Sequence, residues 1–360
     1  SVNRESLDTK LAVRIRTHRY PAYAIGDELL VRGMVKPPLR LHDPLYLSYP
    51  KIEKLRENTS FTVAGMFGRI KSVLNRRIEA ILPEPHASLL KGLLLGEKQS
   101  LPQDFTEELK RSGTSHIVAL SGYNITIVGR TFMARLLAAT VPFIASFWLA
   151  IIAIIGFIFL TGASASLVRA GIMGGLLVLQ KWISRKGFLL NILLFTASVM
   201  LLINPLLLHD VGFQLSFAAT VAIMTFTNPL SKRLEFVPKC FGLRESFAGS
   251  LAAIAITTPI LLWQFGQISI IAPFANLLVL PLVPYAMALT SLGLLAALLS
   301  ASIGTVALMP AWSLSQIMLT LIGLFGAVPF ALLEPAHAQI LAALSVSALI
   351  VCIGRFYATR

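Results

Sequence analysis

The chain has 360 residues, with 31 Lys and Arg against 17 Asp and Glu, and a net charge of +14. Apolar residues make up 56% of the sequence, charged residues make up 13%, and the mean hydropathy is +0.75. These values exclude an ordinary soluble domain of this length. The two cysteines, Cys240 and Cys352, are far apart, which excludes a disulfide framework and the ligand spacing of a zinc site.

The charged residues are concentrated in the N-terminal part. Residues 1–112 hold 19 of the 31 Lys and Arg and 13 of the 17 Asp and Glu. We therefore expect a charged N-terminal region followed by a polytopic membrane domain. No signal peptide precedes this region, and we expect the sequence to be a fragment of a longer protein. The positive charge has two interpretations: the cytoplasmic Lys/Arg bias of inner-membrane proteins, or an anionic substrate.

Residues 1–58 have the pattern of a small β unit. Leu11 to Ile15 alternates apolar and basic residues, and Leu29 to Val35 is predicted to be a strand. Residues 59–113 are predicted to form amphipathic or surface helices. One helix covers 60–83, a short apolar helix covers Ser88 to Gly96, and a third begins with a capping box at Ser100 to Gln103 and ends at Gly113.

Residues 114–356 are predicted to be a polytopic transmembrane domain. Because a crossing needs about 20 apolar residues, we expect about nine spans, at 115–139, 143–161, 163–181, 187–203, 211–228, 247–265, 270–299, 303–329 and 337–354. The span at 270–299 contains Pro273, Pro281 and Pro284, so part of it should be broken or re-entrant.

The loops predict an orientation. Basic residues follow the third, fifth and last spans, whereas the loops at 161–164, 204–210, 266–269 and 330–336 contain no Lys or Arg. The positive-inside rule therefore places the basic loops in the cytoplasm and the N-terminal soluble part outside it.

Polar side chains within the predicted spans gather toward the outer side. Asn124, Thr131 and Arg135 share one face of the first span, because eleven residues make about three helical turns. Each polar residue taken alone could serve only to form hydrogen bonds between packed helices. Intramembrane arginines, however, usually face a partner or a water-filled interior. We expect Arg169 to pair with Asp210, directly or through Gln214, with snorkelling to the surface as the alternative. The candidate path residues are Ser121, Asn124, Thr131, Arg135, Arg169, Asp210, Gln214 and Asn276.

The sequence shows no constellation for chemistry. His116 lies near Ser121 without an obvious third partner, no His/Asp/Glu cluster has metal spacing, and there is no Walker A motif. We expect a transport protein rather than an enzyme, with no catalytic residue, metal or cofactor.

Several ordered motifs resemble the ComEC competence-protein family. The resemblance covers roughly residues 85–300, and residues 1–50 resemble part of that family's OB-fold domain. It rests on Leu93 to Gly96, Ser112 to Gly122, Gly162 through Ala170, Asn204-Pro205, Asp210 to Phe217, and Asn276 through Pro281. It implies an α-helical polytopic inner-membrane protein with a small N-terminal OB-like β piece in the extracytoplasmic space.

The resemblance also implies a function and partners. Such a protein passes one strand of transforming DNA into the cytoplasm, and works with a DNA receptor and with a cytoplasmic motor or strand-capture protein. Family members often carry a C-terminal nuclease domain, and this sequence ends at Arg360 without one, so we expect no nuclease activity here. A small-molecule secondary permease is the alternative, and an intramembrane hydrolase using His116 or Asp210 is a third.

Overall fold

A computed structural model of the chain describes residues 13–16, 28–32, 35–36, 45–48, 51–56, 63–97, 101–118, 122–162, 165–182, 189–238, 242–335 and 337–346. The chain divides into two compact units, residues 1–70 and 71–360. The boundary between them falls inside the first helix, α1 (Val63–Ile81).

The N-terminal unit contains short strands. They are β1 (Val13–Arg16), β2 (Glu28–Arg32), β3 (Val35–Lys36), β4 (Leu45–Ser48) and β5 (Lys51–Arg56). One sheet has the order β1-β4-β3, with β1 parallel and β3 antiparallel to β4, and β2 pairs with β5 in an antiparallel ladder. The predicted β unit is confirmed, but the single strand expected at Leu29 to Val35 is two strands in separate sheets. The OB-like assignment stays a prediction.

Three short helices follow α1: α2 (His86–Leu95), α3 (Gln103–Arg111) and α4 (Ser115–Val118). The predicted helix at 60–83 is confirmed by α1. The N-cap of α3 is Pro102, which offers no side-chain acceptor. Ser100, the first residue of the predicted capping box, lies outside the described residues. The predicted end at Gly113 is confirmed by its φ of 73°, a left-handed conformation that glycine adopts without strain.

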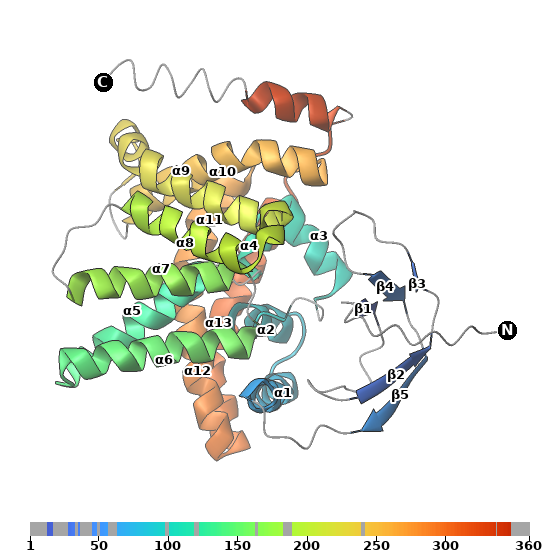
Figure 1. Cartoon of the computed structure of the whole chain (residues 1–360), viewed down its shortest axis with the longest axis vertical. Helices are drawn as coiled ribbons and strands as arrows, with labels where there is room; N and C mark the ends of the chain where they lie inside the picture. Colours follow the sequence, from blue (N-terminus) through green and yellow to red (C-terminus); the bar gives the residue numbers. More distant parts are fainter. Residues whose placement is uncertain are drawn as a thin grey trace. The chain divides into compact units, whose positions relative to one another are not determined.

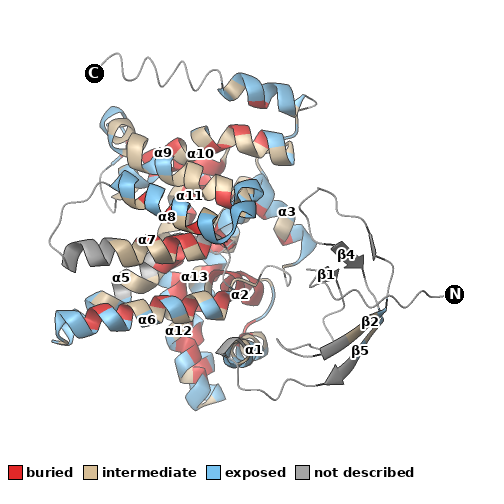
Figure 2. Ribbon diagram, viewed as in Figure 1, coloured by how far each residue is buried: buried red, intermediate tan, exposed pale blue. Residues whose placement is uncertain are grey.

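Helix α2 lies in the core of the second unit. Nine of its residues are buried, from His86 to Leu95 with only Leu94 excepted, and Figure 2 shows the helix in red along its length. A helix that is apolar on every side needs neighbours all round. The core cluster supplies them from α1, α3, α4, α12 and α13. We expected surface helices throughout 59–113, and α2 differs because its apolar residues leave no polar face for solvent.

The remaining named helices are mostly apolar and range from eight to 26 residues. They are α5 (Gly122–Ala138), α6 (Phe143–Thr161), α7 (Ala165–Trp182), α8 (Leu189–Ile203), α9 (Val211–Arg233), α10 (Leu243–Phe265), α11 (Ala272–Val279), α12 (Val283–Leu299) and α13 (Ala301–Gly326). Short elements join some of them: η1 (Pro205–His209), β6 (Ile268–Ser269), η3 (Leu280–Leu282) and β7 (Leu332–Leu333), which pairs with β6. A further helical segment covers 338–346.

Five of these segments are long and apolar enough to cross a membrane, among the described residues. They are α6, α9, α10, the continuous segment Ala272–Leu299, and α13. Described apolar helices at Leu167–Leu176 and Leu189–Ile203 are shorter. Within 270–299 a 3-10 turn, η3, contains Pro281 and lies between α11 and α12, while Ala272–Leu299 as a whole stays one helical segment. The broken or re-entrant course stays a prediction.

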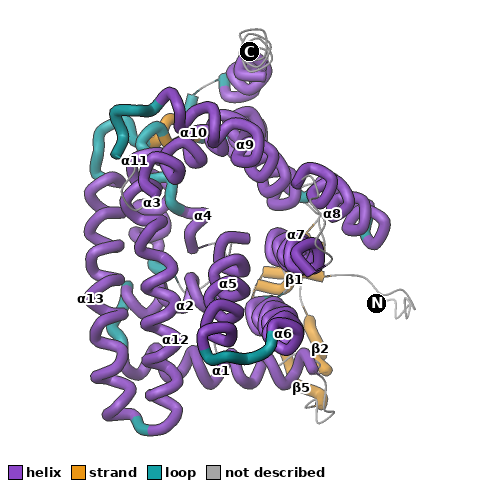
Figure 3. The backbone as a smooth tube through the Cα atoms, turned by 90° about the vertical axis from the view of Figure 1, so that its left-hand side faces the viewer, coloured by secondary structure: helices purple, strands orange, loops and turns teal. Residues whose placement is uncertain are grey.

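Neighbouring helices pack as hairpins and layers. Helix α9 packs along α10, and α12 packs along α13 (Figures 1 and 3). Helix α5 packs against α6 and α7, and α7 also contacts α8 and α9. Many large apolar side chains remain exposed on these helices, for example Leu202, Leu299 and Val306. Lipid is the environment that such an apolar exterior fits.

Candidate functional site

Arg169 of α7 is a buried cation that forms no ion pair with any residue the structure describes. Its exposed fraction is 8%, and its Nε and Nη1 atoms are buried without a hydrogen-bond partner in the part of the chain that the structure describes. Its guanidinium lies over an aromatic ring: the carbon Cζ is 5.5 Å from the ring centroid of Phe217 in α9. A cation over a ring face is attracted by the ring quadrupole, but its charge is not neutralised.

The segment from Asp210 to Phe217 positions that ring. The side chain of Asp210 caps α9 by accepting a hydrogen bond from the Phe213 amide at 2.7 Å. Gln214 Nε2 donates to the carbonyl of Leu208 in η1 at 2.8 Å. The rings of Phe213 and Phe217, one helical turn apart, have centroids 4.4 Å apart. The polar residues of this motif therefore fix the turn from η1 into α9, and its aromatic residues support Arg169.

The pairing predicted between Arg169 and Asp210 is wrong in this structure. Both residues are described, and no ion pair joins them among the described side chains. The physical reason is the helix N-terminus, because its free amides and dipole stabilise the Asp210 carboxylate locally. The snorkelling alternative does not hold either, since Arg169 is buried within the protein.

The predicted residues of the first span lie in different environments. Asn124 is buried, and its Nδ2 donates to the carbonyl of Leu93 at 3.2 Å, which joins α5 to α2. Arg135, near the end of the same helix, is exposed. Thr131 lies between them on α5. Ser121 lies outside the described residues.

Asn276 is the last of the predicted path residues. It is buried in α11, and its Nδ2 donates to Ser250 Oγ of α10 at 3.0 Å. Its Oδ1 is buried without a partner among the described residues. The Nδ2 group therefore forms a hydrogen bond between α11 and α10, whereas the Oδ1 acceptor is unused.

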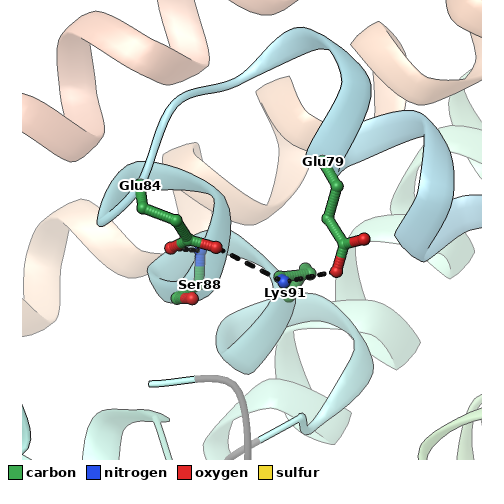
Figure 4. Close-up of polar contacts among 4 residues, drawn as sticks. All are labelled: Glu79, Glu84, Ser88 and Lys91. Atoms are coloured by element: carbon green, nitrogen blue, oxygen red, sulfur yellow. Dashed lines mark hydrogen bonds and ion pairs between the residues drawn. The ribbon is translucent and has the colours of Figure 1, made fainter. Parts of the chain in front are cut away.

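The sequence interpretation missed Lys91, a fully buried lysine in α2. Its Nζ lies 2.8 Å from Glu79 Oε1 and 3.7 Å from Glu84 Oε1 (Figure 4). Glu84 Oε2 also accepts the backbone amide of Ser88 at 3.1 Å. The signal that predicts such a group is a single charge inside an apolar helix, because a buried lysine needs carboxylates to compensate for its lost hydration.

His86 occupies the start of α2, outside the five candidate spans. Its Nδ1 lies 2.9 Å from Ser315 Oγ in α13, and its ring lies 5.5 Å from that of Trp312. Burial lowers the pKa of His86 below the usual 6.5, and the nearby Glu84 carboxylate opposes this shift. The imidazole is therefore neutral at pH 7 and acts as a hydrogen-bonded core group.

The model of the family described as "Competence protein" matches residues 93–359. The chain belongs to the competence protein family. It is 27% identical over 256 residues to ComE operon protein 3 of Bacillus subtilis (strain 168), an alignment that covers 69% of this chain and 31% of that protein. The chain thus spans about a third of the length of this curated relative.

The predicted ComEC-type resemblance is confirmed by these matches. No solved structure matches the chain. All eight candidate path residues of this competence-family chain fall within the matched segment, whereas Glu79, Glu84, His86 and Lys91 lie before its first residue.

Proposed function

We propose that the chain forms the membrane part of a channel that passes single-stranded transforming DNA into the cytoplasm. The observation that carries the proposal is membership of the competence protein family over residues 93–359. The similarity to ComE operon protein 3 supports it. Five segments long and apolar enough to cross a membrane are compatible with a channel. The proposed location is the inner membrane.

The charge of the chain supports an anionic substrate. Residues 1–112 contain 19 basic residues, which can gather a polyanion electrostatically if this region faces the outside. Arg169 adds a cation with no ionic partner among the described residues of the membrane helices. We propose that Ser121, Asn124, Thr131, Arg135, Arg169, Asp210, Gln214 and Asn276 lie along the DNA path. Of these, Asp210 and Gln214 also make the local hydrogen bonds that hold the η1–α9 turn.

The proposal also includes features of the channel that the described helices do not test. They are about nine spans, an extracytoplasmic N-terminal part, a receptor that delivers DNA, and a cytoplasmic motor or strand-capture protein. We also propose that the chain is a transport protein without catalysis of its own. The external supply of energy follows from the absence of a nucleotide-binding motif in this sequence.

Uptake of labelled DNA by a competent host tests the function. In the full-length protein, Arg169→Ala and Arg135→Ala should each reduce uptake at normal expression. The matched controls are Leu202→Ala and Leu299→Ala, because both leucines are more than 80% exposed on the apolar exterior. Normal transformation by both arginine variants would place the path elsewhere. Accumulation of a small solute in proteoliposomes, without DNA binding at low salt, would instead support a permease.

A further inference from the structure

Within the described part of the chain, no anion and no hydrogen-bond acceptor of Nε or Nη1 compensates for the burial of Arg169. Removing a guanidinium from water costs several kcal/mol unless an anion or hydrogen-bond acceptors replace the lost hydration. Four carboxylates follow residue 112: Asp210, Glu235, Glu245 and Glu334. All four are described, and none makes an ion pair with Arg169. Nε and Nη1 have no acceptor in the described structure.

We propose that Arg169, resting on Phe217, is a binding site for one phosphodiester group, and that the DNA strand of the proposed function supplies it. The inference rests on that function and names the group that is recognised. A phosphodiester carries one negative charge, which one buried guanidinium neutralises. Its oxygens accept charge-assisted hydrogen bonds from the unused N–H groups.

The aromatic support explains how Arg169 is held while its N–H groups stay unused. A carboxylate partner would hold Arg169 in place but would occupy its N–H groups and cancel its charge. The face of Phe217 holds the cation without doing either. Phe213 packs against Phe217 at 4.4 Å and is itself fixed by the Asp210 cap on its amide. Phe213 and Phe217 are therefore positioning residues, and Arg169 is the group that touches the phosphate.

The first test compares thermal stability in a phosphate-free maltoside detergent. Arg169→Met removes the charge and keeps an apolar side chain, so the unliganded variant should melt at a higher temperature than the wild type. A purely structural arginine predicts the opposite, and a lower melting temperature would overturn the proposal. Lys232→Met, at an exposed position of α9, is the matched loss of one positive charge and should leave the melting temperature unchanged.

The second test adds ligands to the same samples. A single-stranded oligothymidine should raise the melting temperature of the wild type and of Lys232→Met, and should bind Arg169→Met about tenfold or more weakly. This factor corresponds to the loss of one charge-assisted contact of roughly 1.5–3 kcal/mol. A methylphosphonate oligomer of the same length lacks the backbone charge, so it should not distinguish wild type from Arg169→Met. Equal affinity of both proteins for the charged oligomer would overturn the site.

A third pair of variants separates the charge from its support. Arg169→Lys keeps a positive charge but loses the planar donors, and Phe217→Leu keeps apolar volume but loses the ring face. Both variants should bind the charged oligomer more weakly than the wild type does. Phe217→Tyr keeps an aromatic ring and should retain the wild-type affinity. Wild-type affinity in Phe217→Leu would exclude the aromatic support.

The source of the phosphodiester is tested with phosphatidylglycerol, whose headgroup has the same chemistry. Stabilisation by this lipid alone, lost in Arg169→Met, would overturn DNA as the ligand. The proposed function can also fail independently. If Arg169→Met loses oligomer binding in vitro but the full-length variant takes up DNA normally, the phosphate site stands and its role in the channel does not.

Discussion

Lys91 is fully buried, whereas its two carboxylate partners are partly exposed. The side chains of Glu79 and Glu84 are 26% and 46% exposed, and Glu79 is the closer at 2.8 Å. Because the cation has lost all its hydration and the carboxylates have not, the two halves of this network should respond differently to substitution. Because Lys91 carries the buried charge, removing one of its carboxylate partners should cost more stability than removing Lys91 itself.

We predict that Glu79→Gln destabilises the protein more than Lys91→Met does. Glu79→Gln leaves a buried cation with only the longer contact to Glu84, at a cost of up to about 3 kcal/mol, the lower end for a broken buried pair. Lys91→Met removes the cation itself and should be close to neutral. Melting of each purified variant measures the order, and the reverse order would contradict it. Lys110 and Glu107 form an exposed pair at 3.6 Å, so Glu107→Gln is the control with little expected effect.

His86 should make the stability of this protein depend on pH. Its pKa is lowered by burial in the folded state, so between that value and the unfolded value of 6.5 the unfolded chain binds more protons. The stability that the neutral His86 contributes to the folded state is therefore fully present above pH 6.5. It is lost as the pH falls through the folded-state pKa of His86. His86→Gln keeps a hydrogen-bonding group near Ser315 without titrating. We expect this variant to flatten the acid side of the melting profile, and an unchanged profile would assign the acid sensitivity to other groups.

At the scale of elements, the α12–α13 hairpin depends on a close approach of two backbones. A Cβ atom at Gly304 would lie 2.4 Å from Ala297 Cβ and 2.5 Å from its Cα. A Cβ atom at Gly293 would instead meet the Leu308 side chain at 2.5 Å. Backbone cannot move aside as a leucine side chain can, so the two glycines are not equivalent.

We therefore predict that Gly304→Ala lowers stability by about 1–3 kcal/mol, the usual cost of overpacking, and more than Gly293→Ala does. Gly174 provides the control, because nothing lies within 4 Å of a Cβ atom added there. Gly174→Ala, in the interior of α7, should be neutral or stabilising by up to about 1 kcal/mol from helix propensity. Thermal melting and the yield of monodisperse protein report all three. Equal behaviour of Gly304→Ala and Gly174→Ala would show that the hairpin is packed more loosely.

For the whole molecule, the alternation of basic and charge-free loops predicts the topology. Ser48→Cys in the N-terminal unit should react with a membrane-impermeant thiol reagent in intact cells, after Cys240 and Cys352 are replaced. Lys232→Cys, at the basic end of α9, should react only after the membrane is permeabilised. Each single-cysteine protein in permeabilised cells is the reactivity control. Labelling of Lys232→Cys but not Ser48→Cys in intact cells would invert the orientation.

The sequence predicted the helices better than it predicted the contacts between polar side chains. The helix at 143–161 and the start of α9 at Val211 are properties of local composition, and the structure confirms them. The observed partners of Asp210 and Lys91, in contrast, were not predicted from the sequence. Asp210 and Arg169 are predicted at a similar depth in the membrane, which suggests an ion pair. The Asp210 carboxylate instead accepts a hydrogen bond from an amide at the start of its own helix, α9.

The sequence by itself determined that this chain is mostly helical, that it has segments long and apolar enough to cross a membrane, and that it belongs to the competence family. Hydropathy over about 20 residues and ordered motifs are both properties of the linear sequence. Only the tertiary structure decided that α2 is enclosed, that Lys91 is neutralised by two glutamates, and that Arg169 rests on an aromatic ring with no counter-ion among the described residues. These depend on side chains brought together from different helices. Burial and pairing are properties of that packing, and no local pattern of residues records them.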